Sequence, residues 1–129
     1  MARTATERTA AFVRDRIGDG LRTVVLVTEN DWETAYLRDD LKTVYDRRTY
    51  SEVVDAFRLQ EGFMSPNIDG HPVGERRALV HYHESAFVLQ FPFSETETIL
   101  VSVTNDAGRD LMGFIETVRQ VVEGESPAS

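Results

Sequence analysis

Residues 77–104 read RALVHYHESAFVLQFPFSETETILVSVT, and this stretch decides the fold. It holds three apolar segments, at residues 77–84, 86–93 and 97–104, separated by short polar turns. Aromatic and β-branched runs bounded by turn residues are typical of β-strands, and short turns join antiparallel neighbours. We therefore predict a three-stranded meander whose third strand is apolar enough to be central. Pro92 lacks an amide hydrogen and should lie at a strand end or a bulge.

A further pair of strands precedes the meander. Residues 21–28 are β-branched and apolar almost throughout, as expected of a strand that is covered on both faces. A polar turn follows, and residues 32–38 continue as an alternating segment, so the two segments form a predicted hairpin. Trp32, Tyr36 and Arg38 would share one face of its second strand, where they either stack a planar ligand or pack at the rim of the core.

Three helices complete the pattern, one before the hairpin, one before the meander and one after it. The first covers residues 6–18 and would be capped by Thr6. The second begins with TYSE at residues 49–52, which predicts a capping box with Thr49 as N-cap and Glu52 at the third helical position. Apolar residues recur at helical spacing in the second helix (Tyr50, Val53, Val54 and Phe57) and in the third, at residues 107–123 (Leu111, Phe114, Ile115, Val118 and Val122).

The element order is therefore α-β-β-α-β-β-β-α. It predicts an α+β fold, with a five-stranded, mainly antiparallel sheet and flanking helices. We expect the 129 residues to form a single domain with an ordered core at residues 6–123 and a flexible tail at residues 124–129. Residues 63–75 contain two prolines and two glycines without periodicity, which predicts a long loop that is either functional or a flexible connection.

The charge balance is the most unusual feature of the composition. One lysine, Lys42, stands against thirteen arginines and twenty-two carboxylates, and the formal net charge is −8. This balance fits either adaptation to molar salt or a genome that favours arginine codons, and the acid excess favours the first explanation. It also argues against nonspecific binding of nucleic acids. Without cysteine, a membrane-length apolar run or a signal-peptide core, the chain is expected to be cytoplasmic and not bound to a membrane.

Three segments are similar to a group of small haloarchaeal proteins of unknown function: VHYHE at residues 80–84, FVLQFP at 87–92 and LVSV at 100–103. The element order over residues 6–123 also resembles that of roadblock/dynein-light-chain domains and, more loosely, longin and profilin-like folds. The roadblock resemblance implies a homodimer that shares the edge strand and the second helix, and a protein partner such as a small GTPase. The residues expected at this interface lie in segments 77–84 and 49–60, and are Val80, Tyr82, Val53 and Phe57.

His81 and His83 are the candidate metal ligands. Residues two apart on a strand project to the same side, so both imidazoles would offer a nitrogen to zinc, with Glu84, Asp69 or His71 as possible further ligands. In a symmetric dimer, four imidazoles near the dyad would make the interface sensitive to pH or metal. The alternative, two half-exposed strand residues with ordinary hydrogen bonds, is favoured because a third ligand cannot be placed from the spacing.

The sequence contains no signature of catalysis. It lacks the GxSxG, GxxxxGK[ST] and GxGxxG patterns, and a hydrolase would need a site residue that the sequence does not identify. We expect a non-catalytic, dimerising regulatory or scaffolding module that binds another protein. The alternative is a small-molecule or metal-ion sensor that uses the strand of His81 and His83 and the loop at residues 63–75.

Overall fold

The computed structural model describes residues 1–63, 72–74, 78–111, 113 and 121, with the backbone alone at residues 58–63. The strands are β1 (Leu21–Val27), β2 (Trp32–Leu37), β3 (Leu79–Tyr82), β4 (Phe87–Pro92) and β5 (Thr98–Val103). The helices are α1 (Ala2–Ile17) and α2 (Arg47–Phe63), with 3-10 turns η1 (Gly18–Gly20) and η2 (Asp39–Lys42).

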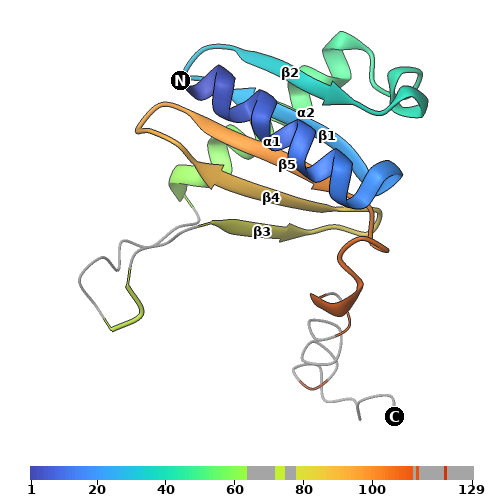
Figure 1. Ribbon diagram of the computed structural model, residues 1–129. Helices are drawn as coiled ribbons and strands as arrows, with labels where there is room; N and C mark the ends of the chain where they lie inside the picture. Colours follow the sequence, from blue (N-terminus) through green and yellow to red (C-terminus); the bar gives the residue numbers. More distant parts are fainter. Residues whose placement is uncertain (64–71, 75–77, 112, 114–120, 122–129) are drawn as a thin grey trace.

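The five strands form one sheet in the order β2-β1-β5-β4-β3, and each neighbouring pair is antiparallel. One helix lies on each face of the sheet, α1 in front of it and α2 behind it in Figure 1. The predicted α+β fold with a five-stranded antiparallel sheet and flanking helices is confirmed. The described strands are shorter than predicted at most ends, and Pro92 is the last residue of β4, which confirms its predicted place at a strand end.

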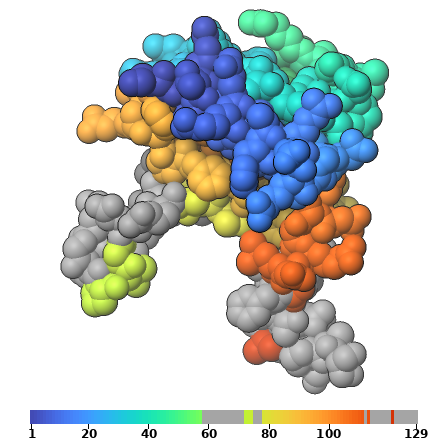
Figure 2. Space-filling view, viewed as in Figure 1, coloured from blue at the N-terminus to red at the C-terminus, as the bar shows by residue number. Residues whose placement is uncertain are grey.

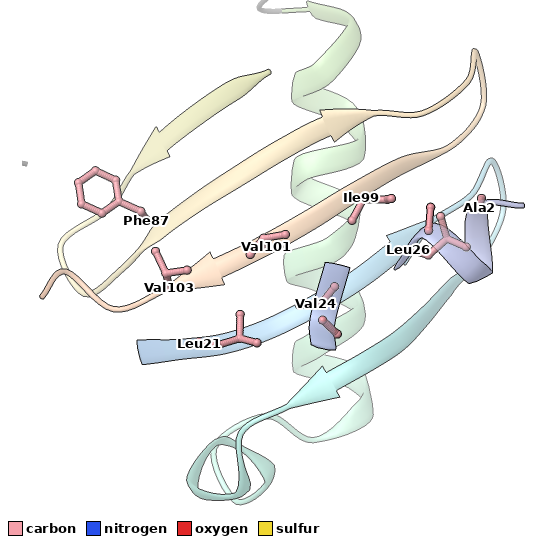
Figure 3. Close-up of a cluster of buried hydrophobic side chains, with 10 residues drawn as sticks. Ala2, Leu21, Val24, Leu26, Phe87, Ile99, Val101 and Val103 are labelled. Carbon is pink, nitrogen blue, oxygen red and sulfur yellow. The ribbon is translucent and has the colours of Figure 1, made fainter. Parts of the chain in front are cut away.

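The centre of the sheet is the pair formed by β1 and β5. All six residues of β5 are buried, because apolar side chains leave it toward both helices. Ile99 and Val101 pack on the α1 side together with Val24 of β1, whereas Leu100 packs on the α2 side. Figure 3 shows the α1-side residues of the two strands next to each other. The prediction that the third strand of the meander is central is confirmed.

Two apolar clusters therefore sandwich the sheet. The α1-side cluster contains Ala2, Ala5, Ala10, Leu21, Val24, Leu26, Phe87, Ile99, Val101 and Val103. The α2-side cluster contains Val25, Val27, Tyr50, Val54, Phe57 and Leu100. The predicted stripe of the second helix is thus buried at Tyr50, Val54 and Phe57, while Val53 is 37% exposed.

The first helix begins at Ala2, and the predicted cap at Thr6 is wrong. Thr6 is a buried residue within α1, and its Oγ1 donates a hydrogen bond to the carbonyl of Ala2 at 2.6 Å. Ala2 and Ala5 pack into the α1-side cluster, although alanine gives only a weak apolar signal in a sequence. The helix ends where predicted, at Gly18, whose φ of 55° lies in the region that favours glycine.

The predicted capping box of α2 is also wrong, because the helix begins at Arg47 and its cap is Asp46. The Asp46 carboxylate accepts a hydrogen bond from the Thr49 backbone N–H at 2.8 Å. Thr49 is therefore a residue of the first turn, and Glu52 pairs with Arg48 at 3.4 Å instead of returning to a cap. Aspartate and threonine are both good N-cap residues. The sequence is therefore compatible with a helix start at either of two positions that lie three residues apart.

Asp46 gives a prediction for the pH dependence of folding. The hydrogen bonds from Thr49 hold the pKa of Asp46 below its ordinary value. A lowered folded-state pKa stabilises the fold above the unfolded-state pKa, and this contribution is lost as the pH falls through the folded value. We expect Asp46→Ala to lower the melting temperature at neutral pH, with the difference from wild type shrinking below about pH 4.

Circular dichroism melts measure this difference, and Glu52→Ala is the control. That substitution removes an exposed pair with Arg48, so we expect it to change the melting temperature little. A larger fall in melting temperature for Glu52→Ala than for Asp46→Ala would contradict the Asp46 cap and would support the capping box of Thr49 and Glu52.

A β-bulge in β2 makes the predicted one-sided row of aromatic residues wrong. The register of β1 and β2 shifts between Val24 and Val25, which leaves Ala35 as the extra residue. Trp32 consequently packs in the α2-side cluster, whereas Tyr36 packs in the α1-side cluster. The sheet lies between the two rings, so they cannot stack on one ligand.

The predicted third helix, at residues 107–123, lies largely outside the described residues, as does the predicted tail. Residues 109–111 are helical. The chain before them is tied to the sheet, since Thr104 donates its backbone N–H to the Gly20 carbonyl at 2.8 Å. Gly108 then lies against the ring of Phe87, so closely that a Cβ would be 2.7 Å from Phe87 Cδ2.

This contact predicts that Gly108→Ala destabilises the fold by about 1–3 kcal/mol, the usual cost of overpacking a core. The Phe87 ring is almost fully buried, so a methyl group at position 108 would press against a side chain enclosed by the core. Urea unfolding measures the effect. The matched control is Gly113→Ala, because a Cβ at Gly113 meets no described atom within 4 Å. Equal free energies of unfolding for Gly108→Ala and Gly113→Ala would contradict the close contact between Gly108 and the Phe87 ring.

Candidate functional site

The candidate site begins at β3, which lies at one edge of the sheet. The predicted edge strand covered residues 77–84, of which Leu79–Tyr82 form the strand and residue 77 lies outside the described residues. A tight turn joins β3 to β4, since the His83 backbone N–H donates to the Ala86 carbonyl at 2.9 Å. The site is therefore a short strand held on one side only.

The position of this turn decides which backbone groups point outward. Hydrogen-bonded and non-hydrogen-bonded pairs alternate in an antiparallel ladder, and the pair of His83 and Ala86 is hydrogen-bonded. His81, opposite Val88, therefore exchanges its backbone bonds with β4. The N–H and C=O of Val80 are directed away from β4, toward the open edge.

His81 and His83 project together to the α2 side of the sheet, as their spacing predicted. Both rings meet the ring of Phe57 edge to face, with centroids 4.8 Å apart for His81 and 5.9 Å apart for His83. Phe57 itself is buried in the α2-side cluster. The helix and the edge strand thus bring two imidazoles onto one aromatic ring.

His81 is further fixed by the side chain of Gln90. Its Nε2 lies 2.8 Å from Gln90 Oε1, and because this oxygen only accepts, the hydrogen is assigned to His81 Nε2. Gln90 is fully buried, and its Nε2 has no hydrogen-bond partner among the described residues. His81 Nδ1 is consequently the nitrogen that this residue offers to a metal.

The described part of the site supplies two metal-ligating nitrogens. No group of three or more histidine, aspartate or glutamate residues is arranged to hold a metal ion within the described part of the chain. Asp69 and His71, which were considered as further ligands, lie outside that part, and Glu84 lies in the turn after His83.

The residues predicted at a protein interface fall in different places. Val80 is 48% exposed, and Val53 is 37% exposed at the cavity between α2 and the sheet. Tyr82 stacks on the Phe87 ring, with centroids 5.0 Å apart, and is partly buried beside the α1-side cluster. Phe57 is only 8% exposed, so it belongs to the core and offers little surface to a partner.

A small cavity, which no sequence pattern predicted, lies between α2 and the sheet. Its volume is about 50 Å³, and its lining is mostly apolar, with Arg22, Thr23, Tyr50 and Ser102 among the lining residues. Burial raises the pKa of Tyr50, whose hydroxyl has no hydrogen-bond partner among the described residues. These residues come from β1, α2 and β5, so no spacing in the sequence indicates that they meet.

A larger open cleft of about 450 Å³ lies between the start of α1 and β2. Its polar residues include Arg3 and Glu33, whose side chains pair at 3.0 Å between Nε and Oε2. Arg38, the third residue of the predicted aromatic face, binds Asp40 at 2.6 Å and the Asp19 carbonyl at 2.8 Å. These exposed pairs are those of a solvated surface.

The comparisons with known proteins identify the family. A family model for a domain of unknown function, DUF7522, matches residues 7–123 and so includes all five strands. No curated protein matches the chain. In the described part of the chain, no helix has the length and apolar content needed to cross a membrane. Because the family model covers most of the sequence, the chain belongs to the DUF7522 family.

Proposed function

We propose that this domain is a non-catalytic interaction module that forms a homodimer across the open edge of β3 and binds a further protein. One observation carries the proposal: the backbone N–H and C=O of Val80 point outward from an edge strand, and its side chain is 48% exposed. An edge strand with outward backbone groups is a template for pairing with another chain.

The other edge of the sheet is protected against such pairing. β2 contains the bulge at Ala35, and its Glu33 forms an exposed ion pair with Arg3. Bulges and charged side chains are the devices by which proteins block edge-to-edge association. β3 pairs with β4 in unbroken register and carries the uncharged residues Val80 and Tyr82. Of the two edges, β3 is the one suited to pairing.

Backbone pairing along β3 needs support from buried side chains. The strand has four residues, and each net hydrogen bond contributes about 0.5–1.5 kcal/mol. On α2, Val53 lines the cavity between the helix and the sheet and is 37% exposed, and the charged pair of Arg48 and Glu52 is exposed nearby in the sequence. Apolar burial at Val80 and Val53 would add to the pairing, and salt would screen the repulsion between two chains of net charge −8.

The likeness to roadblock domains supports the same arrangement. Their element order matches that of the described chain as far as β5, and they pair through the strand that corresponds to β3. A regulatory or scaffolding role toward a partner such as a small GTPase follows from this likeness. The acid excess and the single lysine support a cytoplasm of high salt, as in the haloarchaea, as the setting of the protein.

Val80→Pro tests the edge. Proline is tolerated on an edge strand where the N–H faces outward, so the variant should keep its circular dichroism spectrum. In a symmetric dimer it removes one outward donor from each copy, which predicts a dissociation constant about tenfold or more above that of wild type. Size exclusion with light scattering in molar KCl, over a series of protein concentrations, measures the change.

Thr34→Pro is the matched control on the opposite edge. The Thr28 N–H donates to the Asp31 carbonyl, so the alternation directs the Thr34 N–H away from β1. We expect this variant to dimerise as wild type does. A folded Val80→Pro that dimerises equally well would refute the edge assignment, and a wild type that is monomeric at all concentrations would refute the dimer.

A second candidate function, sensing of a metal ion, is favoured by the two imidazoles on the Phe57 ring. His81 Nδ1 and the His83 ring lie on the same side of β3, so a third ligand from a partner or a bound molecule would complete a zinc site. In a dimer across β3, the second copy is one source of that ligand.

Titration with zinc and cobalt(II) tests this function. We expect the wild type to gain melting temperature with zinc and to give the visible absorption of tetrahedral cobalt. His83→Ala should abolish both effects, and it leaves the hydrogen bond of His81 to Gln90 in place. If the wild type responds to neither metal, metal sensing is ruled out, and the result does not bear on the proposed interaction module.

A further inference from the structure

The cavity between α2 and the sheet combines a mostly apolar lining with one arginine. It lies on the face of the sheet opposite to that covered by α1, which is at the front in Figure 2. Val25, Val54 and Leu100 line it and are almost completely buried, whereas Arg22 and Val53 line it and are partly exposed. The cavity is therefore closed by the core on one side and reaches solvent beside Arg22 and Val53.

A β-bulge in β1 brings Arg22 to this cavity. β1 and β5 pair Leu21 with Val103 and Thr23 with Ser102, so Arg22 is the extra residue of the ladder. Leu21 packs in the α1-side cluster, whereas Arg22 and Thr23 both line the cavity on the α2 side. Neighbours in a regular strand point to opposite faces, so the bulge is what directs these two adjacent side chains to one face. Bulges that re-aim a side chain in this way are frequent next to functional sites.

Arg22 has no carboxylate partner within the described residues, although the chain has an excess of acid. Its Nη1 donates to the Ser85 carbonyl at 3.4 Å, and its Nε is buried without a described hydrogen-bond partner. Both carboxylate oxygens of Asp40 are bound by Arg38, at 2.6 and 2.9 Å. The pKa of Asp40 is accordingly lowered mainly by the hydrogen bond with Arg38, with a smaller effect of Arg22. A partly buried guanidinium with unpaired donors is stabilised by an anion.

The size and the lining of the cavity define which anion fits. A water-sized group needs about 10–15 Å³ of cavity volume, so the 50 Å³ admit about four such groups, the number of non-hydrogen atoms in acetate. Thr23, Tyr50 and Ser102, which are among the lining residues, carry hydroxyl groups, and such groups donate to anions. Because the rest of the lining is mostly apolar, an anion with an alkyl group suits the cavity better than a halide ion.

We propose that this cavity binds a small monocarboxylate of the size of acetate. The carboxylate lies on the Arg22 guanidinium, whose fork of Nε and Nη donors matches two carboxylate oxygens. The alkyl group lies among Val25, Val54 and Leu100 and is removed from water there. The site goes beyond the interaction module and the metal sensor, because neither the outward backbone of β3 nor its imidazoles take part in it.

A titration followed by NMR tests the proposal on the full chain. Potassium acetate replaces KCl at constant potassium and ionic strength, while the signals of the Arg22 Nε–H and of the Val54 and Leu100 methyl groups are recorded. We expect saturable shifts of these signals and nuclear Overhauser contacts from the acetate methyl group to both side chains. Four non-hydrogen atoms limit the Kd to about 40 µM or weaker, so the titration extends to about 100 mM.

Two matched ligands separate a small carboxylate from other occupants. Acetamide has the shape of acetate without its charge, and benzoate has the carboxylate on a ring of the size that fills an apolar cavity of about 150 Å³. Neither compound should shift the signals, and a response to either one equal to that of acetate overturns the proposal. A protein that does not respond to acetate also overturns it. If such a protein responds to chloride added to a potassium sulfate background, the occupant is a halide ion.

Arg22→Met removes the charge and keeps a long apolar stem, so it should weaken acetate binding about tenfold or more. Arg14→Met is the matched control and should bind as wild type does, because Arg14 is exposed on α1 at the other face of the sheet. A folded Arg22→Met with wild-type affinity overturns the proposal. If Arg22→Met does not fold, the contacts in the wild type decide, and their absence from Val54 and Leu100 overturns it. Val80→Pro should bind acetate normally, which separates this test from that of the dimer.

Discussion

The pairing of β1 with β5 is the constraint on which the rest of this structure depends. Both strands are buried, and they send apolar side chains to both faces of the sheet, as Val24 and Val101 do toward α1 and Val25 and Leu100 toward α2. Each helix is thereby given a surface to pack on, and β2 and β4 are held as the next strands outward. The position of β3 as a free edge follows directly, because no described strand remains to cover it.

This arrangement places the functional possibilities at the periphery of the molecule. Within the described residues, the buried polar groups are dispersed: Gln90 binds His81 under α2, and Tyr50 lies beside a small cavity on the same side. The open cleft between α1 and β2 holds the exposed pair of Arg3 and Glu33, and the small cavity under α2 is lined mostly by apolar residues. The edge of β3 and its two imidazoles therefore carry the proposed functions of this DUF7522 domain.

Much of the fold could be predicted from the sequence, because burial on both faces leaves a strong signal. The apolar runs of β1 and β5 identified the central strands, and Pro92 marked the end of β4. The wrong predictions, for the start of α2 and for the faces of β2, have local causes. Asp46 and Thr49 are both good caps, and a single bulged residue, Ala35, moved Tyr36 to the other face from Trp32. The shared side of His81 and His83 follows from strand geometry, whereas their contacts with Gln90 and Phe57 depend on tertiary packing that no spacing encodes.

The most direct measurement of the role of the β3 edge is hydrogen exchange at the Val80 amide, followed by NMR in molar KCl as the protein concentration is raised. This amide is directed away from β4, so it should exchange readily in the monomer and become protected in proportion to the dimer. The amides of β5 should remain protected throughout, because both of its neighbours are always present. Exchange at Val80 that is independent of concentration, in samples that do associate, would contradict pairing through this edge.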